Sequence, residues 1–274
     1  MASLLYALHA DNVTPNATIT ATTENASYPA TNLQDRIFAK VAKLTGTTGN
    51  FVFDFGAAQR VDVIAFGPHN LTAALAGVKI QANATNSWAT PTMDVTLTVP
   101  SYHEDGQSAN VWKDITGESG YDTGGFRYWR LVFGTANAAN IAIGEVWLIA
   151  QKRTLAKNLL WGGQFGITLA DAHPVIEHRT ESGVPLIYDR GYKVRQILGS
   201  LRTSQTGMTE LLSWHRSLRG RVYPTFIVPN SDDTPLADGW FVRFATSEQA
   251  IQRQFHQGNV ATVAWVEDSR GPAL

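Results

Sequence analysis

The seven histidines of this chain are the side chains best suited to acid–base or metal chemistry. A hydrolase needs a nucleophile, a base and a residue that orients the base. The histidines are spread along the sequence, and the nearest two, His173 and His178, are separated by Pro174, so they do not share a helix face. The chain has no cysteine, which excludes thiolate metal sites and cysteine nucleophiles. We therefore predict a protein that is not an enzyme and has no metal site and no cofactor.

Two other segments have the composition of ligand-binding loops. Residues 120–125 are rich in glycine, but no helix is expected after them, so no helix N-terminus would meet a phosphate. Asp232 and Asp233 lie in a segment rich in proline and aspartate, where we expect a solvated loop; a weak calcium site is the alternative. The sequence contains no zinc-protease, nucleophile-elbow or Walker motif.

Five residues are candidates for binding a sugar. His69 and Asn70 could form directional hydrogen bonds with sugar hydroxyls, although we favour the alternative that they bond backbone groups of a turn. The other three, Trp88, Tyr102 and Trp112, fall in or beside expected loops, where an aromatic ring could stack on a sugar. Each of these three is also explained by a place at the edge of a core or at an interface.

The composition fits a subunit that is surrounded by neighbours. Charged residues make up 16% of the 274 residues, below the roughly 25% usual for soluble proteins. A β protein with an ordinary surface is the alternative. The net charge of −1 predicts no nucleic-acid partner. Residues 1–150 hold 8 basic and 12 acidic side chains, and residues 151–274 hold 14 and 11. This asymmetry would help subunits to dock head to tail, unless it arises by chance.

The sequence predicts neither export nor membrane insertion. Its first ten residues lack the basic region of a signal peptide, and no segment approaches the roughly 20 apolar residues of a membrane-spanning helix. We therefore expect a protein made in the cytoplasm without a signal peptide.

The first half predicts short strands and no long helix. Apolar or alternating segments predict strands at residues 51–56, 60–66, 78–82, 93–99, 126–133 and 141–149. Residues 100–125 predict a long polar connection. Many short strands separated by turns are typical of a jelly-roll sandwich, so we place one such domain at residues 1–150.

The second half, residues 151–274, predicts a different domain. A turn at residues 181–183 between apolar segments predicts a hairpin over 175–189. Residues 206–218 predict a helix, with Thr206 as its cap, Gly220 after its end, and one apolar face. That face comprises Met208, Leu211, Leu212, His215 and Leu218. With further strands expected at 194–201, 222–228, 240–246 and 260–266, we predict a β-sandwich or barrel with one packed α-helix.

Five segments of the first half occur in a recognisable order. They are residues 29–35 (PATNLQD), 51–56 (FVFDFG), 61–66 (VDVIAF), 126–131 (FRYWRL) and 143–147 (IGEVW). Together they resemble the discoidin family (coagulation factor 5/8 type C), whose fold is a galactose-binding-like jelly roll, over roughly residues 20–150. One departure is that Lys43 and Leu44 stand where the family often has a tryptophan.

Residues 67–71 (GPHNL) resemble a turn of bacteriophage virion proteins with this kind of domain. The second half resembles, in architecture alone, the ring-forming module of phage tail-tube and distal-tail proteins. The resemblance implies a structural protein of a phage tail tip or baseplate, located in the virion. It would form a ring of its own copies, a hexamer first and a trimer second, and contact other phage tail proteins.

We expect the second domain to supply the ring contacts because arginine, whose planar fork suits interfaces, is frequent there. The expected interface residues are Arg190, Arg195, Arg202, Arg216 and Arg219. The loops of the first domain would face outward and recognise a host surface glycan or another tail protein. A carbohydrate-binding protein or accessory module is the alternative function.

Overall fold

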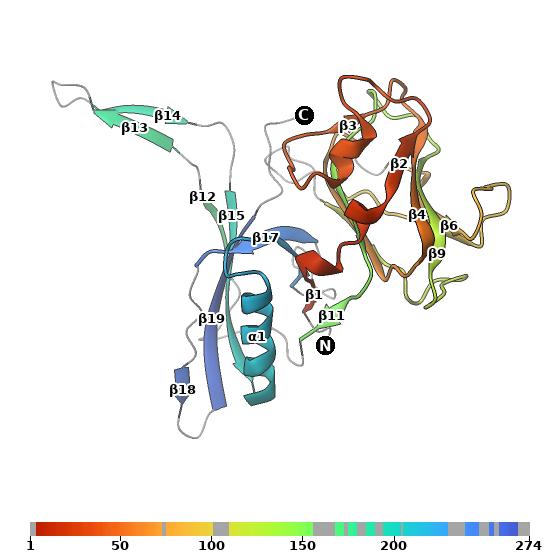
Figure 1. Cartoon of the computed structure of the whole chain (residues 1–274). Coiled ribbons are helices and arrows are strands. Elements are labelled where there is room, and N and C mark those ends of the chain that lie inside the picture. Colours follow the sequence, from red (N-terminus) through yellow and green to blue (C-terminus); the bar gives the residue numbers. More distant parts are fainter. Residues whose placement is uncertain are drawn as a thin grey trace.

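In the residues that it describes, the computed structural model is mainly β with one α-helix, as the sequence predicts (Figure 1). No helix among the parts of the chain that the structure describes has the length and hydropathy to cross a membrane. The described residues are 4–72, 75–100, 110–155, 168–172, 175–179, 185–189, 194–203, 205–229, 239–246, 252–254 and 258–267.

The first half forms a sandwich of two antiparallel sheets. The five-stranded sheet has the order β2 (Thr18–Ala21), β4 (Gly49–Gln59), β9 (Phe126–Phe133), β6 (Val78–Asn83) and β7 (Met93–Thr96). The four-stranded sheet has the order β3 (Ala42–Lys43), β10 (Ala142–Ile149), β5 (Val63–His69) and β8 (Val111–Asp114). Three short 3-10 helices accompany them: η1 (His9–Asp11), η2 (Thr14–Asn16) and η3 (Ala30–Gln34).

The sandwich core lies between these sheets, because alternate residues of each strand face inward. Phe53 and Leu131 of the five-stranded sheet join Ile64 and Val146 of the four-stranded sheet in one buried cluster. Strand β10 differs from the others in that all eight of its residues are buried. A strand buried on both faces needs a second layer outside the sandwich.

The second half supplies that layer as one larger sheet. Its order is β11 (Arg153–Thr154), β1 (Leu5–Ala7), β16 (Thr225–Val228), β17 (Trp240–Phe244), β19 (Gly258–Glu267), β15 (Val194–Thr203) and β12 (Thr168–Ala172), and β18 (Gln252–Gln254) also pairs with β19. Helix α1 (Gln205–Ser217) packs on one face, and the sandwich covers part of the other. Strand β1 thus crosses the division that we expect at residue 150.

A third apolar cluster joins the two units. Phe226 and Phe241 from the larger sheet pack against Val63, Trp147 and Ile149 from the outer face of the four-stranded sheet. The ring centroids of Trp147 and Phe241 lie 5.3 Å apart. The molecule is therefore layered at this point as α1, larger sheet, four-stranded sheet and five-stranded sheet.

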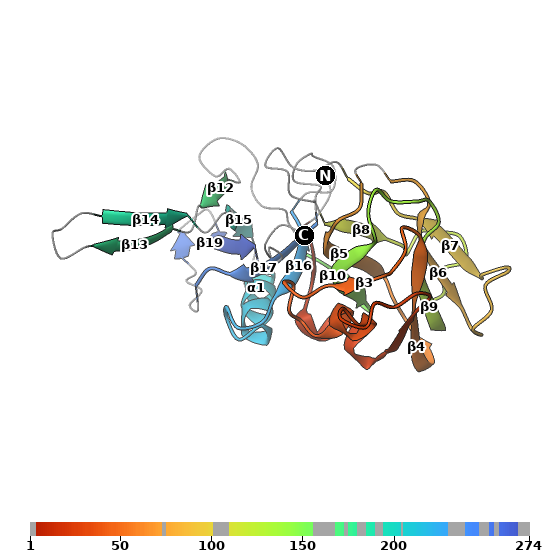
Figure 2. The ribbon, with the colours of Figure 1, turned by 90° about the horizontal axis from the view of Figure 1, so that it is seen from above.

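Strands β13 (Val175–Arg179) and β14 (Pro185–Asp189) form the predicted hairpin. Among the described strands they pair only with each other, in a two-stranded sheet of their own. Figures 1 and 2 both show this hairpin extending away from the rest of the molecule.

The predicted helix is present, with two corrections. It begins at Gln205, so Thr206 lies within the helix rather than capping it. Trp214 is buried while Leu212 is only partly buried, because Trp214 continues the stripe of Met208 and Leu211. The helix ends as expected: Gly220 has a φ of +64°, and its N–H donates to the carbonyl of His215 at 2.9 Å.

Two further expectations about the first half are wrong. The second predicted strand does not stop at residue 66, because β5 continues through the cis Gly67–Pro68 peptide to His69, which pairs with Ile143 of β10. The connection at 100–125 contains β8, which pairs with β5. Its four residues show no alternation of buried and exposed positions, so periodicity could not reveal it.

Candidate functional site

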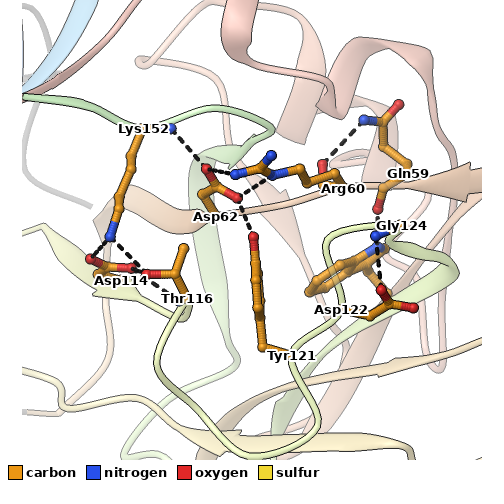
Figure 3. Close-up of polar contacts among 10 residues, drawn as sticks. Gln59, Arg60, Asp62, Asp114, Thr116, Tyr121, Asp122, Gly124 and Lys152 are labelled. Atoms are coloured by element: carbon orange, nitrogen blue, oxygen red, sulfur yellow. Dashed lines mark hydrogen bonds and ion pairs between the residues drawn. The ribbon is translucent and has the colours of Figure 1, made fainter.

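A network of polar side chains lies where the sandwich meets the second unit (Figure 3). Asp62 immediately precedes β5 and is 1% exposed. It accepts hydrogen bonds from both Nε and Nη2 of Arg60, at 2.7 and 2.9 Å. It also accepts from the Tyr121 hydroxyl at 2.6 Å and from the backbone N–H of Lys152 at 3.2 Å. We call the whole network the junction cluster; it comprises Arg60, Asp62, Asp114, Thr116, Tyr121 and Lys152.

The other end of the junction cluster is Asp114, at the end of β8. The Lys152 ammonium donates to Asp114 and to the Thr116 hydroxyl, both at 2.7 Å. Lys152 thereby contacts Asp62 through its backbone N–H and Asp114 through its ammonium group. It follows Ile149, the end of the last sandwich strand, so the junction cluster fixes the chain where it enters the second unit.

Electrostatics indicate a structural role for the junction cluster. Burial acts to raise the pKa of Asp62, but the hydrogen bonds from Arg60, Tyr121 and Lys152 outweigh it and hold that pKa below its ordinary value. Burial and Asp62 together raise the pKa of Tyr121. Asp62 is thus ionised and Tyr121 protonated at neutral pH, and neither is poised to exchange a proton. Within the described ranges, no three His, Asp or Glu side chains are grouped to hold a metal ion.

A pocket of about 480 Å³ opens beside α1. Its lining includes Tyr6 of β1, Arg153 of β11, and Glu210 and Trp214 of α1. The Tyr6 ring stacks on Trp214 at 4.2 Å between centroids, and its hydroxyl donates to Glu210 at 3.1 Å. Arg153 donates two hydrogen bonds to Asp11, at 2.9 and 3.1 Å. Three polar groups that line this pocket, those of Tyr6, Glu210 and Arg153, therefore already have partners within the chain.

The two predicted sugar ligands at the turn are engaged with the protein itself. His69 is 3% exposed, and its Nδ1 accepts the backbone N–H of Leu71 at 3.2 Å. The Asn70 side chain donates to the carbonyl of Asn140 at 2.7 Å and accepts from the N–H of Ala142 at 2.8 Å. These contacts fasten the end of β5 to the segment before β10, which is the structural role that we favour for both residues.

The three predicted aromatic platforms do not come together. Trp88 lies in the β6–β7 loop, with the Arg130 guanidinium 4.4 Å from its ring centroid. Trp112 lies in β8 rather than in a loop, and it packs against the third apolar cluster beside Phe226. Tyr102 lies outside the described residues. Among the candidate ligands that the structure describes, Trp88 alone combines a loop position with an arginine over its ring.

The predicted interface arginines are placed as follows. Arg216 and Arg219 are exposed at the C-terminal end of α1. For Arg195 and Arg202 the structure describes only the backbone of β15, and Arg190 lies outside the described residues. Their place at an interface between subunits stays a prediction.

The sequence analysis did not single out Glu145, a buried carboxyl group of β10. It is 0% exposed and accepts the backbone N–H of Arg36 at 3.0 Å. Burial raises its pKa to about 9, so at neutral pH it is protonated. Its position between apolar residues of a strand is the one signal in the sequence that points to its burial.

No family model and no curated protein matches this chain, whereas solved carbohydrate-binding modules resemble about half of it. The family 32 carbohydrate-binding module of Clostridium perfringens NanJ, solved with galactose, is 14% identical, with a TM-score of 0.38 over 52% of this chain and 96% of that one. The lectin domain of lectinolysin, solved with the Lewis b antigen, is 13% identical, with a TM-score of 0.39 over 51% and 96% of the two chains. A chitosan-binding module from Paenibacillus sp. IK-5 is 17% identical, with a TM-score of 0.37 over 50% and 97%.

Proposed function

We propose that this protein is a non-catalytic structural subunit that assembles with its own copies through the β13–β14 hairpin. The observation that carries the proposal is the placement of that hairpin. It forms a separate two-stranded sheet that extends away from the molecule (Figure 2). A hairpin alone is marginally stable in water, so a long arm of this kind is stabilised when a neighbour covers it.

The register of the hairpin supports this role. Ile176 pairs with Tyr188 and His178 with Leu186, which puts these four residues on one face. The strands also present edges that another chain can pair with or cover. With this register and two edges that no described strand pairs with, the arm suits contact with a neighbouring subunit.

The finer assignment is a phage tail tip or baseplate, with the protein located in the virion. It is supported by the turn at residues 67–71 and by the ring-forming architecture that the second half resembles. An arm that inserts into the next copy makes a heterologous contact, and such contacts close into rings. We propose a hexamer, with a trimer as the second choice, in contact with other tail proteins.

The test removes the arm. In one variant, residues 174–190 are replaced by a short Gly-Ser linker; in the matched control, only the tip at 180–184 is replaced. Light scattering at protein concentrations up to about 0.5 mM should show assemblies for the full chain and the control, and monomers for the armless variant. Assembly that persists without the arm, or a full chain that never assembles, would refute the proposal.

A second candidate function, glycan binding by the sandwich, is favoured by the surroundings of Trp88. The Trp88 Nε1–H donates to Asn86 at 2.7 Å, and the Arg130 guanidinium, which binds Gln81, lies over the ring. A fixed indole beside a guanidinium offers a stacking surface and hydrogen-bond donors for a sugar.

Glycan binding is tested with a glycan array that includes galactose and the Lewis b antigen. Trp88→Ala should abolish any binding seen with the full chain. Tyr28→Ala is the matched control, because Tyr28 is 39% exposed and carries the Lys43 ammonium 4.2 Å from its ring centroid. Equal loss in both variants, or no binding by the full chain, would remove this candidate.

A further inference from the structure

One arginine on the outer face of the five-stranded sheet is bound by neutral groups rather than by a carboxylate. Arg130 of β9 stands opposite Gln81 of β6, and the two neighbours of Arg130 in the strand, Trp129 and Leu131, belong to the sandwich core. Arg130 therefore points away from that core. The five-stranded sheet lies on the side of the sandwich that is remote from the second unit (Figure 2).

Two neutral side chains hold the Arg130 guanidinium in place. Its Nε donates to Oε1 of Gln81 at 2.9 Å, and its Nη2 donates to the same oxygen. Gln81 is 7% exposed, so this acceptor is fixed within the sheet surface. The guanidinium carbon lies 4.4 Å from the centroid of the Trp88 ring. We call these three residues, Gln81, Trp88 and Arg130, the Arg130 site.

The β6–β7 loop is tied together so that Trp88 keeps this position. Asn83, the last residue of β6, donates to the carbonyl of Ser87 at 2.7 Å and accepts from the Thr92 hydroxyl at 3.1 Å. The Trp88 Nε1–H donates to Asn86 at 2.7 Å. The ring and the guanidinium are therefore arranged before any ligand arrives, which lowers the entropy cost of binding.

The charge of Arg130 is not neutralised within the described chain. None of the seven ion pairs formed by described residues includes Arg130. Asp94 of β7, the acidic group whose charge acts on Arg130, is itself paired with Lys79 at 3.0 Å. Nη1 of Arg130 and Nε2 of Gln81 have no acceptor among the described residues, and neither nitrogen is fully buried. The Arg130 site thus offers a positive charge and unused N–H donors.

The arginines that do have acidic partners show the contrast. Hydrogen bonds to aspartates raise the pKa of Arg60, Arg127 and Arg153 above its ordinary value. Burial lowers the pKa of Arg130, and the charge of Asp94 opposes this effect only in part. Burial therefore removes hydration from Arg130 that no described residue replaces, and a carboxylate from outside the chain would offset that loss.

We propose that the Arg130 site binds a sugar that carries a carboxylate. The inference rests on glycan binding by the sandwich, the second function proposed above, and it names the class of ligand. The planar guanidinium and the Gln81 amide supply N–H donors suited to the two oxygens of a carboxylate. The Trp88 ring, which is partly exposed, supplies an apolar surface for the sugar ring.

The test compares acidic sugars with their neutral esters, using the full-length chain. A glycan array carries uronic-acid and sialic-acid glycans, each beside its methyl ester, which keeps the sugar but removes the charge. At least one acid should bind about tenfold more tightly than its ester, because esterification removes the charge-assisted contact with Arg130. Calorimetry at about 50 mM and 500 mM salt should show that the preference for the acid is smaller at high salt.

Two arginines of β9 supply the matched variants. Arg130→Gln should bind acid and ester equally, whereas Arg130→Lys, which keeps the charge without the planar fork, should retain a reduced preference for the acid. Arg127→Gln is the control, because Arg127 also lies beside an aromatic ring, that of Tyr128 at 4.8 Å, but pairs with Asp54. This control should keep the full preference. Thermal unfolding checks that each variant is folded.

Failure of this inference is distinct from failure of glycan binding itself. If acids and esters bind equally and Trp88→Ala abolishes both, glycan binding stands and the proposed ligand class is wrong. If the preference for the acid survives in Arg130→Gln, another cation is responsible and the inference is wrong. If only sulfated glycans bind, the carboxylate is wrong. If no glycan binds, this inference and glycan binding both fall, and assembly through the hairpin is unaffected.

Discussion

The carboxylate of Asp62 accepts a hydrogen bond from the backbone N–H of Lys152 at 3.2 Å, across 90 residues of sequence. A side chain immediately before a sandwich strand thus holds the chain at the point where it leaves the sandwich. The bond has structural consequences because Asp62 is 1% exposed and also binds Arg60 and Tyr121.

We predict that Asp62→Ala lowers the free energy of unfolding by about 3 kcal/mol, because Arg60, Tyr121 and the Lys152 N–H lose the buried acceptor that they share. Asp54→Ala is the control: Asp54 also binds an arginine through two hydrogen bonds, but at the exposed surface. Its effect on the urea midpoint should be much smaller. Equal shifts of the urea midpoint for the two variants would show that the burial of Asp62 does not increase its contribution to stability.

We predict that the titration of Glu145 makes the stability of the folded chain depend on pH. Its pKa is raised to about 9, above the value in an unfolded chain. The protonated Glu145 therefore makes its full contribution to stability below the pKa of the unfolded chain, and this contribution is lost as the pH rises from there toward 9.

The variant Glu145→Gln keeps an acceptor for the Arg36 N–H but has no proton to lose. At pH 8 this variant should be more stable than the unaltered chain by at least ~1 kcal/mol, and near pH 4 the two should agree. Thermal unfolding at both pH values tests this, and a Gln variant that is less stable at pH 8 contradicts it.

A fragment of residues 153–274 should not fold alone. It lacks β1, which lies between β11 and β16, and it exposes Phe226 and Phe241, which the sandwich covers. We expect an aggregating or unfolded product by circular dichroism, and recovery of native structure when a fragment of residues 1–152 is co-expressed. A soluble, cooperatively unfolding 153–274 fragment would show that the second unit is independent.

Three glycines allow the cost of a positive φ to be measured apart from the cost of steric crowding around an added Cβ. Gly125 has a φ of +78°, and an added Cβ would lie 2.2 Å from the backbone of Gln59. Gly56 has a φ of +73° with open space around it, and Gly117 has open space without a positive φ. Replacement by alanine should cost about 1 kcal/mol at Gly56, clearly more at Gly125, and nearly nothing at Gly117. Urea unfolding gives the order, and any other order refutes the explanation.

Local patterns in the sequence were enough to predict most of the elements. Alternation identified β6 and β9, and a stripe at helical spacing identified α1. Strand β1 was not predictable in this way, since Leu5 pairs with Val228 and no local pattern records so distant a partner. The extension of β5 past Gly67 likewise depends on a distant partner, since His69 pairs with Ile143 of β10.

The candidate sites were less accessible to sequence reasoning. Trp112 looks like a loop residue until β8 is known, and Asp62 is an ordinary strand aspartate until Lys152 is placed beside it. Residue type predicted the chemistry of these groups, whereas long-range packing determined which of them meet.

The pairing of Leu5 with Val228 also sets an order of events during translation. The ribosome releases β1 on the order of 10–40 s before β16, at usual elongation rates. All strands of the sandwich, from β2 to β10, are complete by Ile149, so the sandwich can close within that interval. Trp147 and Ile149 then face outward without the sheet that covers them in the finished protein. The nascent chain therefore presents an apolar face to chaperones, and termination soon after residue 155 would release a product that keeps this face uncovered.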